Sequence, residues 1–137
     1  MSPQDNSKIV QQAYADFKAG NIPSLLELVS DSVEWILPEV AGVDVSGTRR
    51  GRDGVADFFQ TLEQSQEVVR FEPREFVAQG DKVVVLGNYT FQVKGTRRQF
   101  TSDWAHVFTI QHGKIVRFQE FTDTAAVSNA YQQRAAA

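Results

Sequence analysis

The stretch KVVVLGNYTFQVKGTRRQFTSDWAHVFTIQHGKIVRFQEF, from Lys82 to Phe121, decides the fold. Within it, β-branched and aromatic residues alternate with polar ones, which is the period-two pattern of strands with one buried face. Turns containing Gly80, Gly95 and Gly113 separate the alternating segments, as expected of hairpin connections. The predicted strands cover residues 68–78, 82–93, 97–111 and 114–121.

The middle hairpin can be aligned from its turn. A loop at Gly95-Thr96 pairs Lys94 with Arg97, and this pairing sets the register of both strands. The register places Gly87 opposite Trp104, where the missing side chain leaves space for the indole. The predicted pairs are Phe91 with Phe100, Tyr89 with Ser102, Gly87 with Trp104, and Val85 with His106.

For the last hairpin we expect a three-residue loop, with Gly113 in the left-handed conformation and a bulge. This loop pairs Ile110 with Lys114. A two-residue loop at His112-Gly113 would instead mix polar and apolar side chains on both faces. The expected pairs are Phe108 with Val116, His106 with Phe118, and Trp104 with Glu120.

These registers collect apolar side chains on one face of the sheet, together with His106 and Glu120. The two polar residues lie diagonally on neighbouring strands, about 7 Å apart. The members of this face are Val83, Val85, Tyr89, Phe91, Phe100, Trp104, His106, Phe108, Val116, Phe118 and Glu120. The opposite face is half polar, which is typical of a surface that is solvated or packed against a second copy. Its members are Asn88, Thr90, Gln92, Asp103, Ala105, Thr109, Arg117 and Gln119. The orientation of the strand over 68–78 is left open.

The segment before the sheet predicts helices. Apolar residues from Ile9 to Phe17 recur at helical spacing, behind a possible cap at Asp5 or Ser7. Gly20 ends this helix.

The remaining elements follow from similar signals. They are a short helix after Pro23, a strand over 33–37, a loop over 39–50, a helix from Asp53, and a last helix over 124–133 capped by Asp123. Helices followed by an antiparallel meander are typical of the α+β class. We predict one domain over residues 1–137, a cone-shaped α+β barrel in which helices pack on a strongly curved antiparallel sheet and enclose an apolar pocket.

Composition excludes several kinds of partner. The chain has 14 Lys and Arg against 17 Asp and Glu, a net charge of -3. Nucleic-acid binding needs a concentrated basic face, so we predict no such partner. There is no cysteine, and the two histidines lack an acidic cluster at ligand spacing, so we predict no metal and no cofactor. Without an apolar signal or membrane-length run, we expect a cytoplasmic protein that does not enter a membrane.

Glu120 and His106 are the candidate catalytic residues. A carboxylate is rarely buried without a partner, and a desolvated Glu beside a His is a common source of a proton donor and acceptor. The same pair could also be purely structural, each side chain satisfying the other. Candidate pocket-lining residues are Trp35, Tyr89, Trp104, Tyr14, Ser102, Phe118 and Phe59, for which core packing is the alternative role.

Several motifs carry a resemblance to a known family. They are Val33-Glu34-Trp35 with Leu37-Pro38, Gly51-Arg52-Asp53-Gly54 before Phe58-Phe59, Gly80-Asp81-Lys82-Val83-Val84-Val85, His106-Val107-Phe108 with Gly113-Lys114-Ile115, and Glu120-Phe121-Thr122-Asp123. From Ile9 to about Tyr131, the chain resembles the SnoaL-like branch of the nuclear-transport-factor-2-like superfamily, which includes ketosteroid-isomerase-related proteins.

The resemblance implies a fold and an acid/base pair. In SnoaL-like polyketide cyclases, a His and an acid on the last strand catalyse an aldol closure, and the matching positions are His106 and Glu120, with Glu in place of Asp. The segment that holds the general base Asp of ketosteroid isomerases reads Val33-Glu34-Trp35 here, so steroid isomerisation is not expected. The resemblance also implies a homodimer through the half-polar outer face of the sheet.

Three functions remain open on the sequence. The leading hypothesis is a cofactor-independent acid/base enzyme of isomerase, cyclase or hydrolase type, acting on an apolar metabolite that carries a carbonyl or an epoxide. The alternative is a non-catalytic module that binds an apolar small molecule. The third is a scaffold whose sheet serves only for association.

Overall fold

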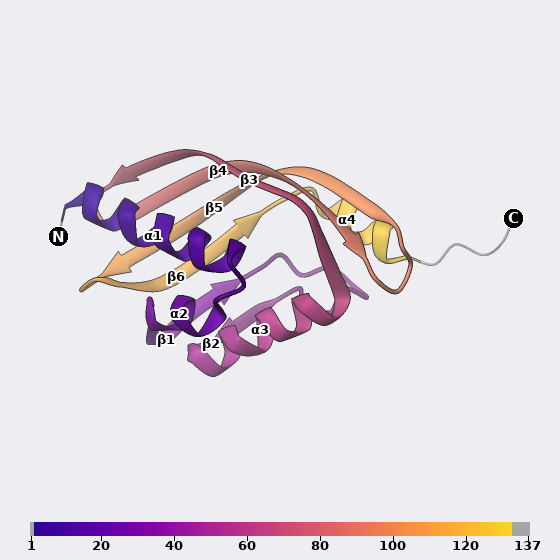
Figure 1. Cartoon of the computed structure of the whole chain (residues 1–137), viewed down its shortest axis with the longest axis horizontal. Helices are drawn as coiled ribbons and strands as arrows, with labels where there is room; N and C mark the ends of the chain where they lie inside the picture. The colour runs from indigo at the N-terminus through magenta and orange to yellow at the C-terminus, as the bar shows by residue number, and fades with distance from the viewer. Residues whose placement is uncertain (1, 133–137) are drawn as a thin grey trace, which may run out of the picture.

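The computed structural model describes residues 2–132, which form four helices and one six-stranded sheet (Figure 1). The helices are α1 (Pro3–Lys18), α2 (Ile22–Glu27), α3 (Gly51–Ser65) and α4 (Thr124–Tyr131). The strands are β1 (Val29–Ile36), β2 (Thr48–Arg50), β3 (Gln66–Gln79), β4 (Lys82–Val93), β5 (Gln99–Gln111) and β6 (Lys114–Phe121). The order across the sheet is β2-β1-β6-β5-β4-β3. The α+β cone is confirmed, and its sheet is open, with β2 and β3 as edges.

The first helix begins earlier than predicted. Its cap is Ser2, and neither Asp5 nor Ser7 takes that position. The Ser2 hydroxyl accepts the Asp5 backbone N–H at 3.1 Å, and the Asp5 carboxylate accepts the Ser2 N–H at 3.2 Å. This reciprocal pair is a capping box, in which the acid in the first turn also interacts favourably with the helix dipole. The predicted end at Gly20 agrees with its left-handed φ of 72°.

The β4–β5 hairpin has the predicted register but a longer turn than the predicted Gly95-Thr96 loop. In place of the expected Lys94–Arg97 pair, the Arg97 N–H donates to the Val93 carbonyl at 2.8 Å, and Arg97 has a left-handed φ of 62°. All four predicted pairs occur: Phe91 with Phe100, Tyr89 with Ser102, Gly87 with Trp104 and Val85 with His106. A Cβ atom added to Gly87 would overlap the Trp104 ring and the Glu72 carbonyl oxygen. The glycine is therefore required by close packing on both sides.

The β5–β6 register differs from the prediction by two residues. His106 pairs with Glu120 and Phe108 with Phe118, whereas Ile110 pairs with Ile115. The connection is the two-residue turn at His112-Gly113, and both residues have positive φ, at 52° and 76°. Such a turn matches the twist of a hairpin. The register shifts between Thr109 and Ile110, where β6 has one extra residue. This extra residue is a bulge that returns the apolar side chains to one face. The bulge therefore lies in the strand and not in the loop.

The N-terminal strand changes the sheet type. β1 pairs parallel to β6, with Trp35 opposite Phe118, so the sheet is mixed rather than wholly antiparallel as predicted. β1 also starts earlier than the expected 33–37. The expected loop over 39–50 ends in β2, which pairs with β1. The third helix then begins at Gly51, two residues before Asp53.

The predicted final helix is present, and Asp123 caps it by accepting the Ala126 N–H at 3.1 Å. The helix ends at Tyr131, and the predicted end at Gln133 lies outside the described residues.

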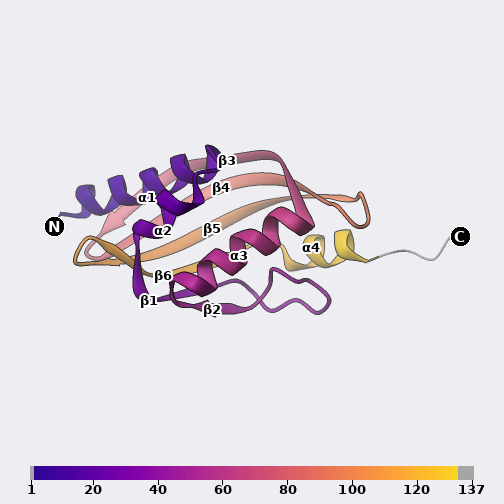
Figure 2. The same ribbon diagram turned by 60° about the horizontal axis from the view of Figure 1, so that its bottom comes forward.

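The helices and the curved sheet enclose the core. α1 packs against β3 and β4, and α3 packs against β1, inside the curve of the sheet (Figure 2). The strand left unoriented by sequence, β3, packs Phe71 and Phe76 against the core. In the described part of the chain, no helix has the length and apolarity needed to cross a membrane.

Candidate functional site

An inner cavity of about 80 Å³ lies between α1, α3 and the inner face of the sheet. Six of the residues predicted for the site contribute to its wall: Tyr14, Trp35, Phe59, His106, Phe118 and Glu120. The rest of the wall is apolar: Ala13, Phe17, Leu25, Phe58, Leu62, Phe71 and Phe108. A mostly apolar wall with a few convergent polar groups is typical of a small-molecule site.

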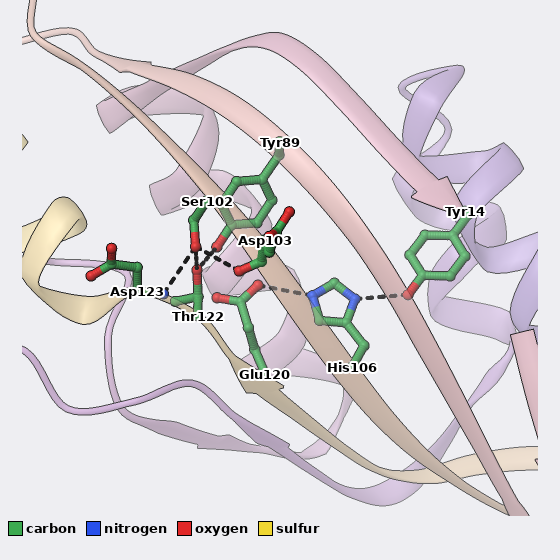
Figure 3. A network of polar contacts seen from close by, with 8 residues as sticks. All are labelled: Tyr14, Tyr89, Ser102, Asp103, His106, Glu120, Thr122 and Asp123. Atoms are coloured by element: carbon green, nitrogen blue, oxygen red, sulfur yellow. Dashed lines mark hydrogen bonds and ion pairs between the residues drawn. The ribbon is translucent and has the colours of Figure 1, made fainter. Parts of the chain in front are cut away.

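Three of these side chains form a hydrogen-bonded chain (Figure 3). The Tyr14 hydroxyl lies 2.7 Å from Nδ1 of His106, and Nε2 of His106 lies 2.9 Å from Oε2 of Glu120. The His106 side chain is 6% exposed and that of Glu120 is 13% exposed. The direct cross-strand pairing of residues 106 and 120 brings the two groups together, so they lie opposite one another and not diagonally.

A protonated Tyr14 fits an arrangement of protons that satisfies both hydrogen bonds of the chain. Burial raises the pKa of Tyr14, and the negative charge of Glu120 raises it further, so the phenol keeps its proton. The Tyr14 hydroxyl can then donate to Nδ1, while the Nε2–H donates to Glu120. This tautomer satisfies both hydrogen bonds, so neither nitrogen of His106 is free for a ligand.

Tyr89 and Ser102 belong to a second network, next to Glu120 (Figure 3). Tyr89 donates to the Thr122 hydroxyl at 2.6 Å, and Thr122 donates to Ser102 at 3.0 Å. Ser102 also accepts the Asp123 N–H at 3.0 Å, which fixes the start of α4. Burial raises the pKa of Tyr89, and Glu120 adds to the effect.

A second, outer cavity of about 70 Å³ adjoins the inner one. It lies under the segment between β1 and β2, which contributes Leu37, Pro38, Val40, Val43, Val45 and Ser46. Tyr89 and Glu120 are the predicted site residues in its wall. Glu120, Phe58 and Leu62 line both cavities, so the carboxylate lies at the boundary between them.

The two tryptophans have different positions. Trp35 lines the inner cavity and stacks on Phe118, with ring centroids 4.1 Å apart. Trp104 stacks on His106 at 4.0 Å and on Phe71 at 5.3 Å, and neither cavity wall includes it or Ser102. Trp104 therefore packs against one face of the imidazole outside the cavity. Ser102 connects β5 to the start of α4 through its hydrogen bond with Asp123.

Sequence reasoning missed the outer cavity. Val43 and Val45 are buried at 7% and 5% exposure, and they lie in a segment that the sequence predicted only as a loop that covers part of the protein, without any residue assigned to a cavity. Leu62 could have been found, because it follows Phe58 by one helical turn. Within residues 2–132, no three His, Asp or Glu side chains converge as metal ligands.

An open, curved sheet that holds helices over an apolar cavity with a His–carboxylate pair defines a cone-shaped α+β protein. The chain belongs to the SnoaL-like family, because the model of the SnoaL-like domain matches residues 10–118.

Solved structures agree with this assignment. An NTF2-like protein from Burkholderia xenovorans LB400 is 36% identical, with a TM-score of 0.88, and the match covers 96% of this chain and 99% of that one. An NTF2-like protein from Burkholderia thailandensis E264 is 29% identical over 93% and 98% of the two chains, with a TM-score of 0.85. TerC, co-crystallised with polyporic acid, is 30% identical over 95% and 98%, with a TM-score of 0.83. No match was found among curated proteins.

Proposed function

We propose that this protein is a cofactor-independent acid/base enzyme, of isomerase, cyclase or hydrolase type, acting on an apolar small molecule that carries a carbonyl or an epoxide. One observation carries the proposal. The Glu120 carboxylate, 13% exposed, lines both cavities while His106 holds one of its oxygens. It is the carboxylate in both walls, and the inner wall is otherwise apolar apart from Tyr14 and His106.

In the proposed mechanism Glu120 removes a proton from carbon next to a carbonyl and returns it to another atom of the same molecule. With an epoxide, it would instead take a proton from a water that attacks one epoxide carbon, and return that proton to the alkoxide released when the C–O bond of the ring breaks. His106 donates Nε2–H to the carboxylate and keeps it oriented, and Tyr14 fixes the imidazole in turn. His106 and Tyr14 are therefore positioning residues, and Glu120 is the group that exchanges protons with the ligand.

The comparisons support a small-molecule ligand. TerC was co-crystallised with polyporic acid, and its 30% identity extends over nearly the whole chain. Polyporic acid is therefore a suitable first ligand for binding assays on this protein.

The test is proton exchange at carbon. A panel of aryl ketones in D₂O should show accelerated exchange at the α-carbon with the wild-type protein, followed by NMR. Glu120→Gln should remain folded, still bind, and lose the acceleration by about 100-fold or more, the range of general base catalysis. Glu34→Gln is the matched control, because Glu34 is on β1 in an ion pair with Arg50 at 2.7 Å. Equal exchange rates in wild type and Glu120→Gln would refute catalysis by this carboxylate.

A binding module is the second candidate. It is favoured by the state of His106, whose two nitrogens are both hydrogen bonded, because this leaves Glu120 without a second free acid/base group. A binding module predicts that polyporic acid or an aryl ketone raises the melting temperature equally in wild type and Glu120→Gln, with no exchange in either. A scaffold predicts no ligand-dependent shift at all.

We also propose that the outer sheet face pairs two copies of the chain. Directly paired residues share a face, and two adjacent rows across β3 to β6 are largely apolar. The rows are Val77-Val84-Val107-Gln119 and Glu75-Leu86-Ala105-Phe121. Val77, Leu86 and Phe121 are 55%, 41% and 50% exposed, and a cluster of large apolar side chains on a surface indicates an interaction site.

The charges on either side of these rows are complementary. The row beyond Val84 contains Lys82 and Arg117, and the row beyond Leu86 contains Glu72 and Asp103. A two-fold axis through the apolar rows would place the cations of one copy against the carboxylates of the other. This arrangement favours a second copy over a partner of unrelated chemistry.

A further inference from the structure

The two cavities are too small to hold a whole metabolite. At about 80 and 70 Å³, each lies well below the roughly 300–1,000 Å³ of typical ligand pockets. A groove of about 550 Å³ lies beside them, between the end of α1, α3 and the start of β3. The groove falls within the range of typical ligand pockets.

The groove and the cavities share walls. Phe17, Phe59 and Phe71 line both the groove and the inner cavity. Leu62 lines the groove and both cavities. Its side chain is half-buried on α3 and forms part of the wall of all three spaces.

We propose that the ligand reaches Glu120 from this groove by passing Leu62, and that the bound ligand keeps an apolar tail in the groove. The inference rests on the proposed function in one respect, because Glu120 is taken as the partner of the ligand's polar end. It adds a ligand class: an elongated, apolar molecule with a small oxygen-bearing head and a tail of a ring or an alkyl chain.

The segment over the outer cavity, which is the alternative entrance, is held in place by hydrogen bonds. Ser46 donates to the Val43 carbonyl at 2.8 Å, and Arg49 donates to the Asp44 carbonyl at 2.9 Å. Tyr131 donates to the Asp44 carboxylate at 3.1 Å. Entry there would break these bonds together. Passage from the groove displaces apolar side chains instead, and side-chain rotation is fast.

The groove selects for apolar character rather than for charge. Ile22, Val68 and Val69 add to its apolar wall, and Val68 and Val69 are 45% and 52% exposed. The charged side chains in its wall have both signs, with Lys18, Arg70 and Lys94 beside Glu63 and Glu67. An uncharged tail is therefore the expected occupant.

The experiment uses 4-alkylphenols, from 4-methylphenol to 4-hexylphenol, with calorimetric titration of the full-length protein. The phenol hydroxyl can donate to Glu120, and the alkyl chain tests the tail. Each methylene that enters the groove should tighten binding about fourfold, which corresponds to about 0.8 kcal/mol per buried CH₂. The Trp35 side chain in the inner cavity wall gives a fluorescence signal for the rate of binding.

Two tryptophan variants locate the tail. Val69→Trp fills the groove at a half-exposed position and should remove the fourfold gain per methylene, with 4-methylphenol unaffected. Val40→Trp fills the outer cavity, which alone of the three spaces has Val40 in its wall, and should leave the gain intact. Leu62→Ala should speed association of 4-hexylphenol. Thermal melts confirm that each variant is folded.

Three results would overturn the inference. One is equal affinity of the wild-type protein for 4-methylphenol and 4-hexylphenol. Another is a gain that survives in Val69→Trp and disappears in Val40→Trp, because the tail would then lie in the outer cavity. The third is an unchanged association rate in Leu62→Ala. None of these depends on turnover, so the exchange experiment on Glu120 can fail while the route holds, or succeed while the route fails.

Discussion

At the scale of single residues, Tyr14 determines what His106 can do. The Tyr14 hydroxyl occupies Nδ1, and this leaves Nε2 to hold Glu120. A buried nitrogen that loses its partner costs about 1–3 kcal/mol. The hydroxyl therefore contributes to stability as well as to the orientation of the site.

Tyr14→Phe should lower the free energy of unfolding by about 1–3 kcal/mol, because the ring packing is kept while Nδ1 loses its hydrogen bond. Urea unfolding at pH 7 measures the loss, and ¹⁵N NMR of His106 should show a change in the tautomer signal. Tyr89→Phe is the control for removal of a neighbouring phenol, and it should leave the His106 signal unchanged. An unaltered ¹⁵N spectrum in Tyr14→Phe would contradict the proposed positioning role.

Alkaline pH should destabilise the fold through the same phenols. Burial raises the pKa of Tyr14 and of Tyr89 above their ordinary value of 10.0. Above pH 10, the unfolded chain loses these protons and the folded chain keeps them, so stability falls as pH rises. Each tyrosine contributes a slope of about 1.4 kcal/mol per pH unit. Urea unfolding between pH 10 and pH 12 should show a shallower slope in Tyr14→Phe, and identical slopes would count against this assignment.

Much of the site at this scale follows from strand alternation. Alternation placed His106 and Glu120 on the apolar face, and the structure confirms that they share it. The hydrogen bond from Tyr14 could not be derived, because it joins α1 to β5 and depends on how the helix packs on the sheet. Ser102 lies opposite Tyr89 as expected. Its hydroxyl, however, accepts the backbone N–H of Asp123 at the start of α4, and strand pairing does not predict a contact with that helix.

At the scale of elements, close packing between β4 and β5 depends on Gly87. Gly87→Ala should destabilise the protein by about 3 kcal/mol, the upper part of the range for overpacked cores, because the added methyl overlaps both Trp104 and the Glu72 carbonyl. Adding Trp104→Phe to Gly87→Ala should restore only part of the lost stability, because the overlap with the Glu72 carbonyl oxygen remains. Gly95→Ala is the matched control in the next turn, where a Cβ meets nothing within 4 Å. Urea unfolding of the three variants and of the wild-type protein checks the order.

The strand registers show which local signals suffice. The β4–β5 register was predicted correctly, with Gly87 opposite Trp104, because both hairpin strands continue without interruption and the longer turn keeps the same alignment. In the β5–β6 hairpin the turn itself is tight, and the extra residue lies further along β6. A bulge in the loop and a bulge in the strand both place the apolar side chains on one face of the sheet. The sequence pattern therefore could not show which of the two positions holds the extra residue. The parallel β1–β6 pair is a contact between distant segments, for which the sequence carries no turn signal.

At the scale of the whole molecule, the outer face predicts association. Arg117→Glu should weaken the dimer, because the new carboxylate would meet Asp103 of a second copy. Asp103→Lys should weaken it as well, and the double variant should regain affinity because the opposite charges are restored in exchanged positions. Sedimentation velocity over a range of concentrations measures the assembly. A monomeric wild-type protein, or a double variant no better than the single ones, would refute the proposed geometry.

The parallel pairing of β1 with β6 also has a consequence for how the protein is made. Val29 pairs with Ile115 and Trp35 with Phe118, so β1 leaves the ribosome long before its partner strand is synthesised. Until then, the edge of β1 that pairs with β6 has no partner strand, and Val33 and Trp35 lack the neighbouring side chains of β6. The nascent chain therefore needs its last quarter before the N-terminal half can close, and a chain released early would present β1 to chaperones or to other unfinished chains.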